Sequence, residues 1–217
     1  MTALVAVVCG LVGLFTGVLV NRVAGRFPWT GRKSGAPAVR RPVVEVGTAA
    51  LFVVVVLRFG ASWELLPFLF LAGVAVLLAV VDVQHKLLPN RVVVPSIAIG
   101  SVLLLVAAVP GGDWADLLRG VLAGLVLFAV YLVLALVNPR GLGMGDVKLA
   151  GLLGLHLGWL GWPVVVYGTL AAFLGQALIA LLLLATRHIG LRGELPFGPA
   201  MLLGAAVAIG GSNALLV

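Results

Sequence analysis

Cysteine and charged residues are both scarce in this sequence of 217 residues, and each scarcity excludes a class of protein. Cys9 is the single cysteine and lies in the first apolar run, which excludes an internal disulfide and a zinc site built on cysteines. Charged residues make up 10% of the chain, whereas soluble domains carry about a quarter. The composition therefore argues against an ordinary soluble domain.

Hydrophobic residues make up 63% of the chain. The apolar runs are long and uniform, and a helix needs about 20 such residues to cross a bilayer. The stretch 147–186 is too long for one crossing, and GWLGWP at 158–163 divides it into a short helix and a longer one. We expect an all-α polytopic membrane bundle of about eight transmembrane helices, forming one membrane-embedded domain over 1–217. The other expected spans are 2–20, 43–59, 64–82, 92–110, 117–137 and 197–216.

The basic residues behind the net charge of +7 gather in loops on one expected side of the membrane, and they do not indicate a nucleic-acid partner. If the short basic loop 22–42 is cytoplasmic, only Arg58 and Arg119 fall outside. We therefore expect both termini outside and four loops inside. The residues expected inside are Arg22, Arg26, Arg32, Lys33, Arg40, Arg41, Lys86, Arg91, Arg140, Lys148, Arg187 and Arg192.

Two of the seven acidic residues, Asp82 and Asp146, are expected at the same membrane face. Asp82 closes the third span, which runs inward, and Asp146 opens the sixth, which runs outward. Carboxylates at a membrane border are costly and usually functional. Simpler accounts stay open for each residue alone: Asp146 as a helix N-cap, and Asp82 as a terminal residue that faces the lipid headgroups.

Two facing carboxyl groups can hydrolyse a peptide bond by acid–base catalysis, as in the aspartic proteases. Like charges this close do not both ionise easily, so one carboxyl keeps a proton while the other acts as a base. The base takes a proton from water, and the acid protonates the substrate carbonyl or the leaving amine. Gly143 and Gly145 in the GLGMGD segment would let the backbone bend around such a site and approach an extended peptide. No metal or other cofactor is expected for this proteolysis.

Five segments, in order along nearly the whole chain, resemble the type IV prepilin peptidases, also called leader peptidases. GMGDVKLAG at 143–151 is similar to the Gly-x-Gly-Asp motif of that family, and VDVQHKLLPN at 81–90 to its other aspartate motif. The remaining matches are GLFTGVLVNRVAGRFP at 13–28, RRPVVEVGTA at 40–49 and LPFGPAMLLGA at 195–205.

The resemblance implies catalytic roles for Asp82 and Asp146 in a membrane aspartic endopeptidase. Its substrates would be prepilin-like or pseudopilin precursors, cut at the cytoplasmic face of a bacterial inner membrane to remove a basic leader. Supporting roles fall to Gly143 and Gly145, and to Lys148, Glu45 and Asn21. Simpler accounts stay open for two of these: Lys148 as a positive-inside lysine, and Asn21 as an interhelical hydrogen-bonding residue.

Larger members of the family carry a zinc-binding domain with two Cys-x-x-Cys pairs in the first loop, associated with methylation of the new pilin N-terminus. The loop 22–42 has no cysteine and resembles the short form. Methylation with S-adenosylmethionine therefore stays open, as do the identity of the prepilin, the oligomeric state and the resting separation of the aspartates. Two alternatives also stay open: a proton-coupled transporter that uses both aspartates, and a non-catalytic membrane subunit of a secretion or pilus machine.

Overall fold

The structure is a computed structural model that describes residues 2–28, 37–138, 141–186 and 195–215. This part of the chain forms eight helices and no strand. In chain order they are α1 (Thr2–Ala24), α2 (Val43–Phe59), α3 (Leu65–His85), α4 (Asn90–Gly111), α5 (Trp114–Val137), α6 (Met144–Leu160), α7 (Trp162–Ala185) and α8 (Gly198–Leu215). The expected all-α bundle of about eight helices is confirmed.

The expected division of 147–186 is confirmed at Gly161, which separates α6 from α7. Gly161 has φ 140°, a backbone angle that favours glycine, and Pro163 then occupies the first turn of α7. Other boundaries differ from expectation. Helix α1 continues into the basic loop as far as Ala24, and α3 continues past Asp82 to His85. Polar residues at a helix end reduce hydropathy without ending the helix.

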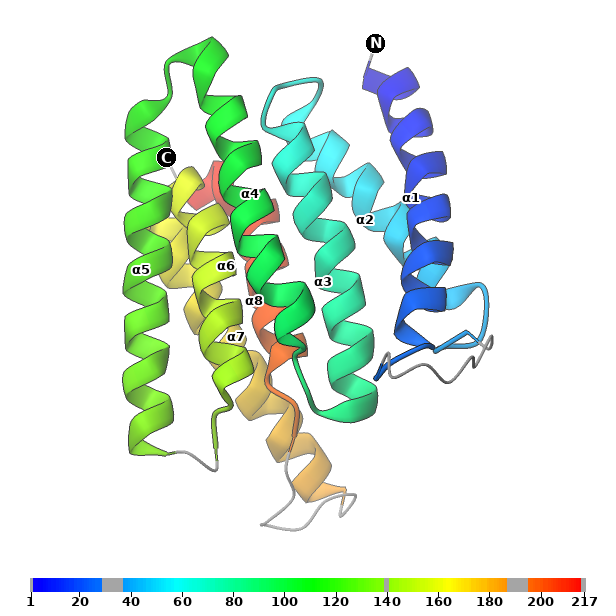
Figure 1. Ribbon diagram of the computed structural model, residues 1–217, viewed down its shortest axis with the longest axis vertical. Coiled ribbons are helices and arrows are strands. Elements are labelled where there is room, and N and C mark those ends of the chain that lie inside the picture. Colours follow the sequence, from blue (N-terminus) through cyan, green and yellow to red (C-terminus); the bar gives the residue numbers. More distant parts are fainter. Residues whose placement is uncertain (1, 29–36, 139–140, 187–194, 216–217) are drawn as a thin grey trace.

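The helices run up and down, and successive connections alternate between two ends of the bundle (Figure 1). Helix α3 ends and α6 begins at the same end, which we call the aspartate end. Arg58 and Arg119, expected on the other side, lie in the last turn of α2 and the first turns of α5, at the opposite end. The described basic residues of the expected inner group lie near the aspartate end. Arg32, Lys33, Arg140, Arg187 and Arg192 lie outside the described residues.

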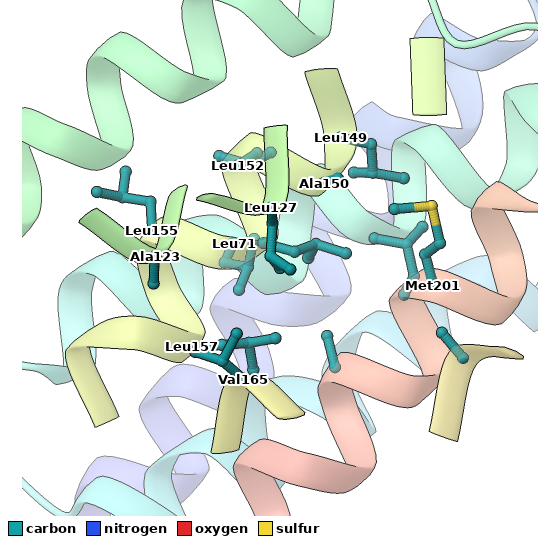
Figure 2. Packing of buried hydrophobic residues seen from close by; sticks show 14 of the residues in the cluster. Leu71, Ala123, Leu127, Leu149, Ala150, Leu152, Leu155, Leu157, Val165 and Met201 are labelled. Atoms are coloured by element: carbon teal, nitrogen blue, oxygen red, sulfur yellow. The ribbon is translucent and has the colours of Figure 1, made fainter. Parts of the chain in front are cut away.

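Helix α6 occupies the centre of the bundle. All its residues from Leu149 to Trp159 are buried. In Figure 2, its leucine side chains lie among side chains of the surrounding helices, including Leu71 of α3, Leu127 of α5 and Met201 of α8. At the opposite end, the Arg119 guanidinium donates to the carbonyls of Gly158 and Trp159, at 2.7 and 2.6 Å. These bonds satisfy carbonyls that the helix itself leaves free.

The surface of the bundle is apolar, as the hydrocarbon of a bilayer requires. Five helices, α1, α3, α4, α5 and α7, are long and apolar enough to cross a membrane. Large side chains such as Leu57 and Leu174 point outward with more than half of their surface exposed. The protein is a polytopic helical membrane bundle.

Candidate active site

Asp82 lies within the last turn of α3 and is only 4% exposed. One of its oxygens, Oδ2, accepts a hydrogen bond from the backbone N–H of Gly198, at 3.1 Å. Gly198 is the first residue of α8, so the bond joins two helices that are distant in sequence. The simpler account of Asp82 as a terminal residue facing the headgroups is therefore wrong, because α8 covers it.

Asp146 is the third residue of α6, and its exposure is intermediate. Its Oδ2 accepts a hydrogen bond from the backbone N–H of Gly143, at 3.0 Å. The account of Asp146 as the N-cap is wrong in position, since Gly143 is the N-cap. The carboxylate nevertheless satisfies a free N–H at the positive end of the α6 dipole. Asp146 therefore has a structural partner of its own.

The LLPN turn that follows α3 brings the two aspartates together. Leu88 in this turn is buried between the starts of α6 and α8. A Cβ on Gly145 would lie 2.7 Å from the Leu88 Cβ, and one on Gly198 would lie 3.4 Å from its Cδ1. Glycine at 145 thus permits the close approach of α6 to the turn. Leu88 thus packs against Gly145, the residue before Asp146, and against Gly198, the residue that binds Asp82.

Lys148 and Asn90 form a second link between the two aspartate motifs. The Lys148 ammonium donates to the Asn90 side-chain oxygen at 2.7 Å, on the exposed side of the junction. Asn90 begins α4 and closes the VDVQHKLLPN segment. Lys148 therefore ties the start of α6 to the start of α4, and a direct role in the reaction stays a prediction.

Asn21 and Glu45 lie together in a separate buried network between α1 and α2. The Asn21 amide donates to the carbonyl of Val39 at 2.9 Å and to Glu45 Oε1 at 3.2 Å, and its own oxygen accepts from the Val39 N–H. Arg41 pairs with the same glutamate oxygen at 3.4 Å. The Gln84 amide donates to the neighbouring Ala38 carbonyl at 2.6 Å. The network therefore holds the segment before α2 against Gln84 of α3, which lies two residues after Asp82.

Two residues near the aspartates were not among the expected site residues. Gly198 binds Asp82 through its backbone, and its only signal was its place in the PFGP segment. Tyr131 of α5 is buried within electrostatic range of Asp146, and its ring lies 6.2 Å from that of Phe197, centroid to centroid. Tyr131 stands in a long apolar run, where the sequence gives no sign of the neighbouring acid.

Of the histidines that the structure describes, neither His85 nor His156 is hydrogen-bonded to an aspartate. The His85 ring lies 4.7 Å from that of Phe27. His156 is buried in α6, where its Nδ1 lies 2.9 Å from the Leu152 carbonyl oxygen, so its role there is in packing. Within the described ranges, no three His, Cys, Asp or Glu side chains gather to hold a metal ion.

The comparisons with known proteins agree with the motifs. The model of the type IV leader peptidase family matches residues 69–209, which include both aspartates and Gly198. The chain belongs to this family. Asn21 and Glu45 precede the matched region.

Curated relatives extend the similarity toward the N-terminus. Proteins named prepilin leader peptidase/N-methyltransferase from Pseudomonas putida, Aeromonas salmonicida and Bacillus subtilis are 35%, 36% and 33% identical to this chain. The alignments cover 79%, 82% and 77% of this chain, but only 59%, 62% and 64% of the relatives. The chain thus spans about three-fifths of the length of these relatives. No solved structure matches.

Proposed function

We propose that this chain is a membrane aspartic endopeptidase that removes the basic leader from type IV prepilin-like or pseudopilin precursors. One observation carries the proposal: a buried aspartate of α3 and an aspartate of α6 lie at one end of the bundle, where both helix ends pack against Leu88. Membership of the type IV leader peptidase family and the names of the curated relatives support the choice of substrate. The transporter alternative receives no support from these relatives.

The proposed mechanism divides the work between the two carboxyl groups. The ionised carboxyl takes a proton from a water molecule as that water attacks the scissile carbonyl carbon. The protonated carboxyl donates a hydrogen bond and then its proton to the carbonyl oxygen, and a proton is later returned to the leaving amine. Cleavage yields a carboxylate on the leader and a free amine on the pilin.

Each aspartate is oriented by a backbone donor, which leaves its second oxygen for this chemistry. Gly198 fixes one oxygen of Asp82, and Gly143 fixes one oxygen of Asp146. Both bonds pre-organise the carboxyl groups before substrate arrives, which lowers the cost of reaching the reactive geometry. The partial exposure of Asp146 supplies the route for water.

The proposed site of cleavage is the cytoplasmic face of a bacterial inner membrane. The distribution of Lys and Arg supports this orientation. A basic leader would stay on the same side for the same reason, while the apolar segment of the pilin enters the bilayer. Proteolysis would need no cofactor. Methylation with S-adenosylmethionine is a separate activity on which the aspartate pair has no bearing.

The proposal is tested with the purified protein in lipid vesicles and a full-length prepilin. Mass spectrometry should find a single cut just before the apolar segment, and the cleavage should survive EDTA. Asp82→Asn should abolish it, whereas Asp116→Asn, at the opposite end, should leave it unchanged. Cleavage at unrelated positions, or loss of activity with EDTA and recovery with zinc, would contradict the proposal.

A further inference from the structure

An apolar groove of about 290 Å³ runs along the outside of the bundle between α2, α3 and α8. Its lining begins near the aspartate end with Ala79 of α3 and Pro199 of α8. It ends toward the opposite end with Phe68 of α3, Gly210 of α8 and the Arg58 side chain of α2. The groove therefore follows the long axis of the bundle.

The groove starts at the candidate active site. Ala79 precedes Asp82 by three residues, which places both on one face of α3. Pro199 follows Gly198, whose N–H binds the Asp82 carboxylate. By contrast, a smaller groove of about 180 Å³ between α4, α5 and α6 comes no closer along α6 than Gly151, five residues beyond Asp146. A chain that leaves the aspartates through the membrane therefore meets the larger groove first.

The length and polarity of the groove restrict what it holds. The stretches Phe68–Ala79 and Pro199–Gly210 each span about 17 Å at 1.5 Å per residue. The lining is apolar except for Arg58, whose guanidinium already donates to the Ser212 hydroxyl and the Ile209 carbonyl. An extended peptide would leave its own N–H and C=O groups without partners here. A helix satisfies these groups internally and therefore fits.

We propose that this groove receives the first three turns of the apolar helix of the prepilin while its leader lies across the aspartates. This inference rests on the proposed function. A prepilin that is cut immediately before its own apolar helix must place the start of that helix beside Asp82, where the groove begins. The groove would thus select substrates by the helix that follows the cut, in addition to the leader that precedes it.

The test fills the groove and compares two substrates. Ala206 lines it from α8 and is exposed, so a tryptophan at this position fills the groove without entering the core. Ala206→Trp should raise the KM for full-length prepilin by about tenfold, a change of about 1.4 kcal/mol. It should leave cleavage of a short peptide unchanged if that peptide holds the leader and ends a few residues after the cut. The control is Ala177→Trp, at an exposed position of α7, which should alter neither rate.

A photocross-linking residue identifies the occupant. Benzoylphenylalanine at Val76, in the groove, should form an adduct with prepilin in the Asp82→Asn protein, whereas the same residue at Leu178 of α7 should not. Adducts with phospholipid alone or with a second copy of this chain would overturn the inference. If the Ala206→Trp variant cleaves prepilin with the same KM as the unsubstituted protein, the inference is overturned as well. Failure of the unmodified protein to cleave either substrate would instead overturn the proposed function.

Discussion

Asp82 and Asp146 are both held by backbone N–H groups, but the donors come from different places. Asp146 is bound by Gly143, within the start of its own helix. Asp82 is bound by Gly198, which belongs to another helix. The geometry of Asp82 therefore depends on how α8 is seated against α3, whereas that of Asp146 is local.

Gly198→Ala tests this dependence. A Cβ at this position would lie 2.5 Å from Asp82 Oδ2, so either the carboxylate or the start of α8 must move. A displacement of about 1 Å at a catalytic group costs up to about a hundredfold in rate. We expect kcat for prepilin cleavage to fall by one to two orders of magnitude, as measured with purified protein.

Gly175→Ala provides the matched control, because a Cβ there meets nothing within 4 Å. Both variants should remain folded, since alanine favours a helix over glycine by up to about 1 kcal/mol. If Gly198→Ala cleaves prepilin as fast as Gly175→Ala does, the Gly198 bond does not position Asp82.

The aspartate pair was predictable from sequence, whereas its supports were not. Alternating spans place Asp82 and Asp146 at one membrane face without any knowledge of packing. Gly198 acts through a backbone N–H, which every residue except proline has, so its residue type gives no sign of the contact. Tyr131 lies in an apolar run of the sequence. Only the packing of α5 on α6 brings it near Asp146, so the sequence gives no sign of this neighbour.

Helices α5 and α6 pack backbone to backbone through small residues on both. A Cβ on Gly154 of α6 would lie 2.7 Å from the carbonyl oxygen of Ala123 and 2.9 Å from the Cα of Gly124, both in α5. Gly120 of α5 likewise faces the carbonyl of Leu155. Helices in lipid lack a hydrophobic drive to associate, so this close fit and its dispersion contacts hold α6 in place.

A larger side chain at the contact between α5 and α6 should separate the two helices. We expect Gly154→Val to destabilise the protein by about 1–3 kcal/mol, because the neighbouring backbone cannot move aside cheaply. The midpoint of thermal unfolding in detergent should fall, and prepilin cleavage should weaken with it since α6 carries Asp146. Gly175→Val, on the open face of α7, should alter neither quantity. An unchanged unfolding midpoint in Gly154→Val would contradict this, because it would show that the contact between α5 and α6 accommodates a larger side chain.

Hydropathy predicted where the helices lie but not which of them is enclosed. Lipid and protein interior both select apolar residues, so an apolar run does not show whether its helix is enclosed, as α6 is, or exposed, as α7 is. The small residues of α6 pack closely against the backbone of α5. Arg119 and its bonds to the end of α6 could not be foreseen, because they depend on two helices lying side by side.

The orientation of the whole molecule follows from its charges and stays a prediction. Cysteine labelling tests it in a Cys9→Ser background. Leu87→Cys, exposed in the turn at the aspartate end, should react with an impermeant maleimide only after the cells are permeabilised. Asp113→Cys, exposed at the opposite end, should react in intact cells. The reverse pattern would place the aspartates outside and exclude cleavage at the cytoplasmic face.

The most direct test of the central claim is the single-turnover rate of prepilin cleavage by Asp82→Asn, Asp146→Asn and the double variant. Asparagine keeps the shape of each side chain and removes its acid. If the two carboxyl groups act as one unit, each single variant loses about a thousandfold or more, and the double variant is no slower than the slower single one. Near-normal cleavage by either single variant, with the protein folded in the membrane, would contradict the shared site.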